Sequence, residues 1–433
     1  MLEQTSALQV GPQGHLLFNG ADTVELAHTY GTPLYVMDED GIRAACRSYK
    51  QSIEKNYHGR GQIFYASKAF CCKAICRIMA EEGMGLDVVS AGELYTALQA
   101  GFPAGEICFH GNNKTDEELR LALEKGVGRF AVDNRWELHR LSRFAADMGK
   151  TAHILFRIKP GVEAHTHEFI QTGQIDSKFG VALETGEAME IVKEALGLPG
   201  IHLEGVHCHI GSQIFDVAPF ELAAEKMLRF MDQVRRETGH VIRELDLGGG
   251  FGIRYTAEDQ PVPYGRYMEL VAGVIRRVCA ELDFPEPFIT MEPGRSIVGA
   301  SGITLYTVGS VKEIPGVRTY AAVDGGMTDN PRYALYQSRY DAVAIEKANQ
   351  PRTMRVTLAG KCCESGDLLG EDMPIQPIQS GDLVAVLSTG AYNYSMASNY
   401  NRIPRPAVVF VKDGQPRLAV RRETWEDLVS CDL

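Results

Sequence analysis

Short apolar runs alternate with longer amphipathic stretches between about residue 33 and residue 298. Many of the amphipathic stretches begin with Ser, Thr, Asp or Asn and end with Gly, as capped helices do. Eight strand–helix units of this kind predict a (β/α)8 barrel. A doubly wound open sheet is the rival fold, because periodicity alone does not show whether a sheet closes. The eight strand-like runs are Ile63–Ser67, Leu86–Ser90, Ile107–His110, Phe130–Asp133, His153–Ile158, Gly205–Ile210, Glu244–Gly248 and Phe288–Glu292.

The pattern changes after residue 298, where strand-like segments follow one another with few helical turns between them. These segments predict a second, β-rich domain of sandwich or barrel type. A hairpin is expected around His15–Asn19, and we expect the N-terminal segment to pack with this domain. The predicted domains are therefore the barrel at residues 33–298 and the β-rich domain at residues 1–32 and 299–433. The later segments are Thr304–Val311, Arg318–Val323, Met354–Leu358, Leu383–Leu387 and Ala407–Lys412.

Composition narrows the class of partner. The chain has 433 residues, with 56 Asp and Glu against 44 Lys and Arg, which gives a formal net charge of −12. An acidic surface repels nucleic-acid phosphates and anionic lipid, so we expect neither as a partner. The N-terminus has no basic start and no apolar run, and no stretch reaches membrane-spanning length. The ten cysteines form no spaced disulfide framework, so we expect a cytoplasmic protein.

Two glycine-containing segments follow the last two predicted barrel strands. They are Gly248–Gly252 and Glu292–Arg295. Loops after strands seven and eight of such barrels often bind phosphate, and glycine lets backbone N–H groups approach the oxygens closely. Glycines also form ordinary tight turns, which is the structural alternative for either loop taken alone. The coincidence of both loops favours a phosphate site.

Lys68 lies at the end of the first predicted strand. A lysine there commonly extends to solvent. Partial burial instead lowers the pKa of the amine, which can then form a Schiff base with a carbonyl group. A lysine beside a phosphate site is what a pyridoxal phosphate pocket requires.

Three further positions carry candidate chemistry. Alternation places His207 and His209 on one strand face, which suggests zinc, but no third ligand has characteristic spacing, so we expect no metal. His209 is either a core histidine or a ring stacked on a planar cofactor, with Ser212 donating to phosphate. Glu292 follows an apolar strand and could keep a pyridine nitrogen protonated. The adjacent Cys362 and Cys363 are by themselves no evidence of catalysis.

With these residues in place, the chain resembles the diaminopimelate decarboxylases, within the fold type III pyridoxal-phosphate decarboxylases. The resemblance spans Tyr35 to Asn401 and rests on eight motifs in order. They are Tyr65–Ala69, His165–His167 with Asp176–Gly180, His209–Ser212, Gly248–Gly252, Glu292–Arg295, Asp329–Tyr336, Cys363–Ser365 and Gly390–Tyr392.

The resemblance implies a role for each matching residue. Lys68 would bind pyridoxal phosphate covalently, His209 would stack on its ring, and Glu292 would pair with the pyridine nitrogen. Cys363 would protonate the carbanion carbon, and in relatives this cysteine comes from the partner subunit, which implies a homodimer with shared active sites. If the register slipped by one residue, Cys362 would take its place. The phosphate would be held by Ser212, Gly249, Gly250, Gly294 and Arg295, and the substrate by Arg295, Arg332, Tyr336, Glu364 and Tyr392, the last also contacting the cofactor.

The implied substrate is meso-diaminopimelate, which has an amino-acid head at each end. An arginine fork matches its distal carboxylate, and Glu364 complements its distal ammonium. Lysine and ornithine lack that carboxylate and would leave the site's groups unpaired. The expected reaction yields L-lysine and carbon dioxide. The alternatives are a decarboxylase of arginine, ornithine or a carboxylated polyamine on the same fold, a non-catalytic cofactor-binding relative, and a cofactor-free (β/α)8 hydrolase or aldolase.

Overall fold

The computed structural model describes residues 7–162 and 177–433, and the chain folds as two compact units. Unit 1 comprises Met1–Ala44, Ile253–Gln260 and Arg295–Leu433, and unit 2 comprises Ala45–Gly252 and Pro261–Gly294. The motif residues His165–His167 and Asp176 lie outside the described residues. Among the residues that are described, no helix combines the length and the apolar character needed to cross a bilayer.

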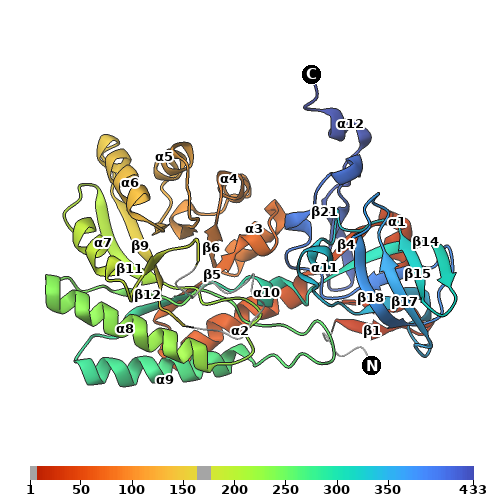
Figure 1. The fold of residues 1–433 in the computed structure, drawn as a ribbon, viewed down its shortest axis with the longest axis horizontal. Coiled ribbons are helices and arrows are strands. Elements are labelled where there is room, and N and C mark those ends of the chain that lie inside the picture. Colours follow the sequence, from red (N-terminus) through yellow and green to blue (C-terminus); the bar gives the residue numbers. More distant parts are fainter. Residues whose placement is uncertain (1–6, 163–176) are drawn as a thin grey trace. The chain divides into compact units, whose positions relative to one another are not determined.

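Unit 2 is a closed barrel of eight parallel strands (Figure 1). Neighbouring strands pair around the ring, and two contacts close it: β8 pairs with β9, and β13 pairs with β5. This closure confirms the predicted (β/α)8 barrel and excludes the open sheet. The strands are β5 (Gly61–Ala66), β6 (Gly85–Val88), β7 (Ile107–Phe109), β8 (Arg129–Val132), β9 (Ala152–Lys159), β11 (Ile201–His207), β12 (Glu244–Asp246) and β13 (Phe288–Met291), and a short β10 (Val181–Ala182) pairs with β9.

Helices connect successive barrel strands and begin where the sequence predicts caps. Ser90 and Asn134 each accept a hydrogen bond from the backbone N–H three residues later, and Thr115 forms a capping box with Glu118. Gly126 ends its helix in the left-handed region, at φ 74°. The connecting helices are α3 (Lys73–Glu81), α4 (Ala91–Gln99), α5 (Asp116–Lys125), α6 (Arg135–Asp147), α7 (Glu187–Ala195), α8 (Ala218–Thr238) and α9 (Tyr264–Leu282), and α2 (Glu39–Tyr57) precedes β5.

Unit 1 is built on a sheet whose central strand is the long β14 (Gly302–Ile314). Side chains alternate along β14, so that Ile303 and Leu305 enter one apolar cluster while Tyr306 and Val308 enter another. Two buried layers therefore flank the sheet, as expected for the predicted β-rich domain. The sheet order is β18 (Leu368–Ile375), β17 (Met354–Ala359), β15 (Arg318–Val323), β14, β4 (Leu34–Asp38), β20 (Ala407–Lys412) and β21 (Gln415–Val420), while β19 (Leu383–Val386) pairs with β14 and with β16 (Ala342–Ala344).

The N-terminal segment forms the expected hairpin and belongs to unit 1. Strands β1 (Leu8–Val10), β2 (Leu16–Phe18) and β3 (Ala21–Asp22) form a small antiparallel sheet, followed by α1 (Thr23–Tyr30). Leu16 and Phe18 are fully buried in the same cluster as Ile303 and Leu305. This shared apolar cluster anchors the hairpin to the unit.

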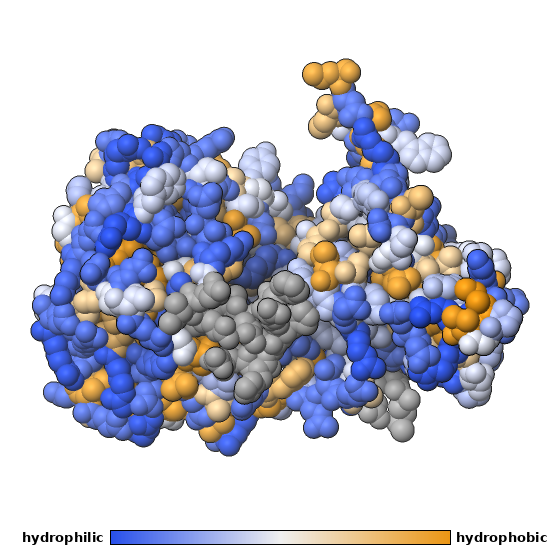
Figure 2. All heavy atoms as spheres, viewed as in Figure 1, coloured by the Kyte–Doolittle hydropathy of each residue, from blue (hydrophilic) through white to orange (hydrophobic). Residues whose placement is uncertain are grey.

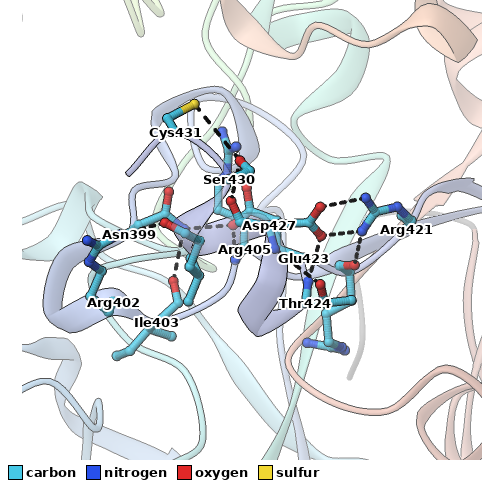
Figure 3. Close-up of polar contacts among 12 residues, drawn as sticks. Asn399, Arg402, Ile403, Arg405, Arg421, Glu423, Thr424, Asp427, Ser430 and Cys431 are labelled. Carbon is cyan, nitrogen blue, oxygen red and sulfur yellow. Dashed lines mark hydrogen bonds and ion pairs between the residues drawn. The ribbon is translucent and has the colours of Figure 1, made fainter. Parts of the chain in front are cut away.

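The C-terminal segment of unit 1 is held by charged contacts (Figure 3). Glu423 accepts hydrogen bonds from Asn399 and Arg405, and Arg421 pairs with Asp427. Asp427 also completes a capping box with Thr424 at the start of α12 (Trp425–Val429). The exposed helix α12 thus begins at a defined residue, although it is only five residues long.

Candidate active site

Lys68 lies just beyond the carboxyl end of β5, in a single helical turn formed by Ser67–Ala69, and it is half-buried. The Ser67 hydroxyl donates to the Glu93 carboxylate at 2.8 Å, and that carboxylate also accepts from the Val89 N–H at 2.8 Å. These contacts fix the turn that presents the lysine. Burial raises the pKa of Asp87, on the adjacent strand β6, to about 6, and the positive charges of His110 and Lys68 oppose that shift.

Three loops meet beside this lysine's end of the barrel. The Glu292 N–H donates to the Gly248 carbonyl at 2.7 Å, and the Ile214 N–H donates to the Gly250 carbonyl at 2.9 Å. The loops that follow β11, β12 and β13 are therefore joined by backbone hydrogen bonds. Ser212 lies in the loop after β11 and is half-buried.

The glycines of the middle loop are required by close backbone approach. A Cβ on Gly249 would lie 2.1 Å from the Glu292 carbonyl oxygen. Gly250 has φ +106°, a conformation that side chains disfavour, and a Cβ there would lie 2.3 Å from the Gly211 carbonyl oxygen. A Cβ on Gly294 would lie 3.0 Å from that of Ala69, next to Lys68. A loop of this shape, with no side chains on Gly249 and Gly250, leaves its backbone open to close approach by a ligand.

Glu292 is a buried carboxylate between two histidines. Its Oε1 lies 2.6 Å from His110 Nε2, and its Oε2 accepts a hydrogen bond from His207 Nε2 at 3.0 Å. Burial by itself would raise the pKa of Glu292, but the charges and hydrogen bonds of His110 and His207 outweigh it and hold the pKa well below its usual range. Glu292 is therefore held as an anion at the carboxyl end of the barrel strands.

His209 is half-buried and neutral. Its Nδ1 accepts a hydrogen bond from the Gly249 N–H at 3.2 Å, which leaves the proton on Nε2. Burial, followed by the charges of Lys68 and Arg157, places the pKa of His209 well below its usual range. His207 and His209 have different partners, and within the described residues His209 joins no group of three side chains able to ligate a metal.

Four of the predicted substrate residues come together in unit 1. Arg295, in the short helix α10 (Arg295–Val298), donates to the Tyr255 hydroxyl at 2.5 Å. Two guanidinium groups approach the Tyr392 ring, with Arg295 Cζ 4.8 Å and Arg332 Cζ 5.5 Å from its centroid. Arg332 Cζ also lies 5.5 Å from the Tyr336 ring. The sequence interval between these residues is large, and the structure gathers them into one group.

Arg332 carries an unused donor. It begins α11 (Arg332–Tyr336), is 9% exposed, and donates through Nη2 to the Ser338 hydroxyl at 3.2 Å. Its buried Nε has no hydrogen-bond partner in the part of the chain that the structure describes. A buried guanidinium with a spare N–H is costly unless a ligand satisfies it. The chemistry of that donor fits a carboxylate.

Cys363 and Glu364 lie in the loop between β17 and β18, and both are exposed. The Cys363 N–H donates to Asn401 Oδ1 at 2.7 Å, and the Glu364 N–H donates to the Cys362 carbonyl at 2.8 Å. Burial and the nearby charge of Asp367 raise the pKa of Cys362 to about 12. The two adjacent thiols therefore differ: the one at 363 faces solvent, and the one at 362 is held as a thiol.

The sequence did not indicate the importance of His110 and Asp87, and no spacing in the sequence links His110 to Glu292. The available signal was position, because both residues lie at the carboxyl end of a barrel strand, where active sites of this fold are built.

The barrel is closed, a lysine follows its first strand, and glycine loops with a buried anion beside them follow its last two strands. These features define a pyridoxal-phosphate-binding enzyme. The model of the "Pyridoxal-dependent decarboxylase, pyridoxal binding domain" family matches residues 39–299. The chain belongs to the diaminopimelate decarboxylase family of the pyridoxal-dependent decarboxylases. The expected enzyme class, a carboxy-lyase, and the expected cofactor, pyridoxal phosphate, are confirmed.

The similarity covers nearly all of each chain. The diaminopimelate decarboxylase of Bacillus subtilis is 52% identical over 420 residues, which are 97% of this chain and 95% of the relative. That of Halalkalibacterium halodurans is 50% identical over 425 residues, 98% of this chain and 97% of the relative. The crystal structure of diaminopimelate decarboxylase from M. jannaschii in complex with L-lysine has a TM-score of 0.91 at 36% identity and covers 100% of this chain and 99% of its own.

Proposed function

We propose that this chain carries out the reaction of its family, the pyridoxal-phosphate-dependent decarboxylation of meso-diaminopimelate to L-lysine and carbon dioxide, and that the residues described above divide the work. The similarity to diaminopimelate decarboxylases over nearly the whole chain supports the reaction. The observation that carries the residue roles is the arrangement of Lys68, Glu292 and Gly249 at one end of one barrel. When bound, pyridoxal phosphate supplies the electron sink that accepts the electron pair left by carbon dioxide.

Lys68 holds the cofactor through its amine, and the glycine loop holds the phosphate. The backbone near Gly249 and Gly250 is kept open by the absence of side chains, which supports close approach of phosphate oxygens. Ser212, Gly294 and Arg295 complete the phosphate site in this proposal. His209 would stack on the ring, and the Gly249 N–H orients its neutral imidazole.

Glu292 would accept a hydrogen bond from the protonated pyridine nitrogen, and His110 and His207 keep Glu292 ionised for that role. A carboxylate that remains charged in a buried site favours a protonated ring nitrogen by charge complementarity. The contacts at 2.6 and 3.0 Å support this positioning role for the two histidines. Without the two histidines, burial would raise the pKa of Glu292, and the resulting uncharged carboxyl group would no longer favour a protonated ring nitrogen.

Arg332, Arg295, Tyr336, Tyr392 and Glu364 bind the substrate in this proposal. The spare Nε of Arg332 supports recognition of the distal carboxylate, which lysine, ornithine and arginine lack. Glu364 binds the distal ammonium. No observation favours an ornithine, arginine or carboxylated polyamine substrate over diaminopimelate.

The active enzyme is a homodimer in which Cys363 of one subunit delivers a proton to the substrate carbon bound by the other. The exposure of Cys363 and Glu364 supports this arrangement, because a proton donor that serves its own chain would be expected inside the site. Apolar side chains of the C-terminal segment also face solvent: Trp425 is 80% exposed and Val429 55%. Figure 2 shows apolar residues at the tip of that segment, on an otherwise mainly hydrophilic face. We place the enzyme in the cytoplasm, since its ten cysteines, all within the described residues, form no disulfide.

Covalent trapping tests the central role. Borohydride reduction of the cofactor-loaded enzyme, followed by peptide mapping, should place the cofactor mass on Lys68. Lys68→Ala should lose the long-wavelength cofactor absorbance and turnover, because its side chain supplies the only amine proposed for the linkage. Lys73→Ala, which removes an exposed lysine at the start of α3, is the matched control and should retain both. Cofactor mass on another lysine, or normal turnover by Lys68→Ala, would refute the assignment.

A further inference from the structure

Two histidines lie side by side at the amino end of the barrel. His153 is the second residue of β9 and His202 is the second residue of β11, and the two are direct partners in the parallel pairing of these strands. Partners in register point to the same face of a sheet. Their rings accordingly lie with centroids 5.3 Å apart, at an interplanar angle of 65°.

A β-bulge adds a carboxylate to this pair. The pairing of β11 with β9 shifts between Leu203 and Gly205, which leaves Glu204 as the extra residue. Bulges commonly redirect a side chain. Here Glu204 Oε1 lies 2.8 Å from His153 Nδ1 and 3.3 Å from His202 Nε2. The three ligand atoms all lie within 4.8 Å of one another.

The 3.3 Å separation of Glu204 Oε1 from His202 Nε2 is that of two neighbouring ligands of one metal ion, while the 2.8 Å separation from His153 Nδ1 is that of a hydrogen bond. Zinc bonds of 2.0–2.2 Å to nitrogen and oxygen in a tetrahedral site place neighbouring ligand atoms about 3.4 Å apart. His139 with Glu194 shows the ordinary alternative: one histidine and one carboxylate at 2.6 Å, with no second histidine in the group.

We propose that His153, His202 and Glu204 form a binding site for a divalent transition-metal ion, with Zn²⁺ as the reference ligand. Two imidazoles and a carboxylate are a donor set that Zn²⁺ uses, with a fourth position open to water. The side chains are 48%, 54% and 29% exposed, so an ion reaches them from solvent. The site lies at the opposite end of the barrel strands from Lys68 and Glu292, and it is separate from the proposed decarboxylation.

The ion is expected to link β9 and β11 near the start of their pairing, where His153 and His202 are partners. An ion that binds the folded barrel and not the unfolded chain raises the melting temperature as its concentration rises. We therefore expect Zn²⁺ to increase the melting temperature of the cofactor-loaded enzyme in a concentration-dependent way, with turnover unchanged.

Calorimetric titration of the cofactor-loaded enzyme with Zn²⁺ tests the site. Because loss of an outer partner of a metal ligand already costs 10- to 100-fold in affinity, His202→Gln and Glu204→Gln should each weaken one binding event by at least about ten-fold. His139→Gln is the matched control and should leave that event unchanged. Circular dichroism and cofactor absorbance establish that each variant is folded, since none of these residues contacts the cofactor site.

Cobalt provides a second readout that separates this site from the exposed thiols. Co²⁺ bound by nitrogen and oxygen gives visible ligand-field bands without the intense thiolate charge-transfer band. We expect such bands in the wild type and in His139→Gln, and their loss in His202→Gln. Absence of Zn²⁺ binding in the wild type, equal affinity in His202→Gln, or a thiolate band for the bound Co²⁺ would each overturn the proposal.

Discussion

Glu292 gains its character from residues far away in the sequence. His110 follows β7 and His207 ends β11, and their rings lie edge to face, with centroids 4.9 Å apart and one carboxylate oxygen of Glu292 beside each ring. The type of residue at 292 was predictable from the motif around it. Its ionisation was not, because that depends on two imidazoles that only closure of the barrel brings to it.

The positioning role of His110 predicts a change in pH dependence. Glu292 has a depressed pKa, so its anionic form persists as pH falls until that low pKa is reached. In His110→Gln one of the two groups that lower the pKa is gone, so the pKa rises and activity should be lost at a higher pH on the acidic side. Cofactor affinity, measured by absorbance titration, should weaken over the same pH range.

A merely structural role for His110 gives a different result. In that case His110→Gln would lower the melting temperature and would leave the acidic limb of the kcat profile in place. The variant Glu292→Gln provides the upper limit of the effect, since loss of a preorganised charge typically lowers kcat by about 10²–10³-fold. An unshifted acidic limb in His110→Gln with full cofactor affinity contradicts the positioning role.

At the scale of elements, the loop after β12 tolerates few residue types because neighbouring backbone lies so close to it. Its backbone passes so close to the loop after β13 that Gly249 has no space for a methyl group. Neighbouring backbone cannot move away without breaking the hydrogen bond from the Glu292 N–H to the Gly248 carbonyl. The conformation of this loop therefore requires glycine at position 249.

Gly249→Ala should displace both loops and weaken cofactor binding. Overpacking of this kind costs typically about 1–3 kcal/mol in stability. Gly273→Ala, in the middle of α9, is the control, because a Cβ there meets nothing within 4 Å. That control should be stabilised by roughly 0.4–1 kcal/mol. Denaturant unfolding and cofactor titration of the two variants measure both effects, and equal behaviour of the pair would contradict the account of the loop.

Most strands could be predicted, because a buried strand flanked by capped helices leaves a local pattern. All eight predicted barrel runs coincide with strands β5 to β9 and β11 to β13, and the later segments coincide with β14, β15, β17, β19 and β20. Which strands pair with one another is harder to predict, because partners are far apart in the sequence. Leu34–Asp38 is as apolar as any barrel strand, and only its hydrogen bonds with β14 and β20 assign it to the sheet of unit 1. The β-bulge at Glu204 likewise has no sequence signal of its own.

At the scale of the whole molecule, shared active sites make a prediction about mixed subunits. In the proposed homodimer, Lys68 and Cys363 of one site come from different chains. Lys68→Ala and Cys363→Ala homodimers should each be inactive or nearly so. Subunit exchange between them should restore about a quarter of the wild-type activity, since half of the dimers formed at random then contain one intact site. Activity that does not recover after verified exchange would place both residues in the same chain's site.

Substrate choice is the most direct test of the central claim, that this chain is a decarboxylase that recognises both ends of its substrate. Purified, cofactor-loaded enzyme would be incubated separately with meso-diaminopimelate, lysine, ornithine and arginine, and carbon dioxide and amine product would be measured. We predict equal amounts of carbon dioxide and L-lysine from meso-diaminopimelate and no release from the other three. Turnover of ornithine, arginine or lysine in place of meso-diaminopimelate, or no turnover with cofactor bound, would contradict it.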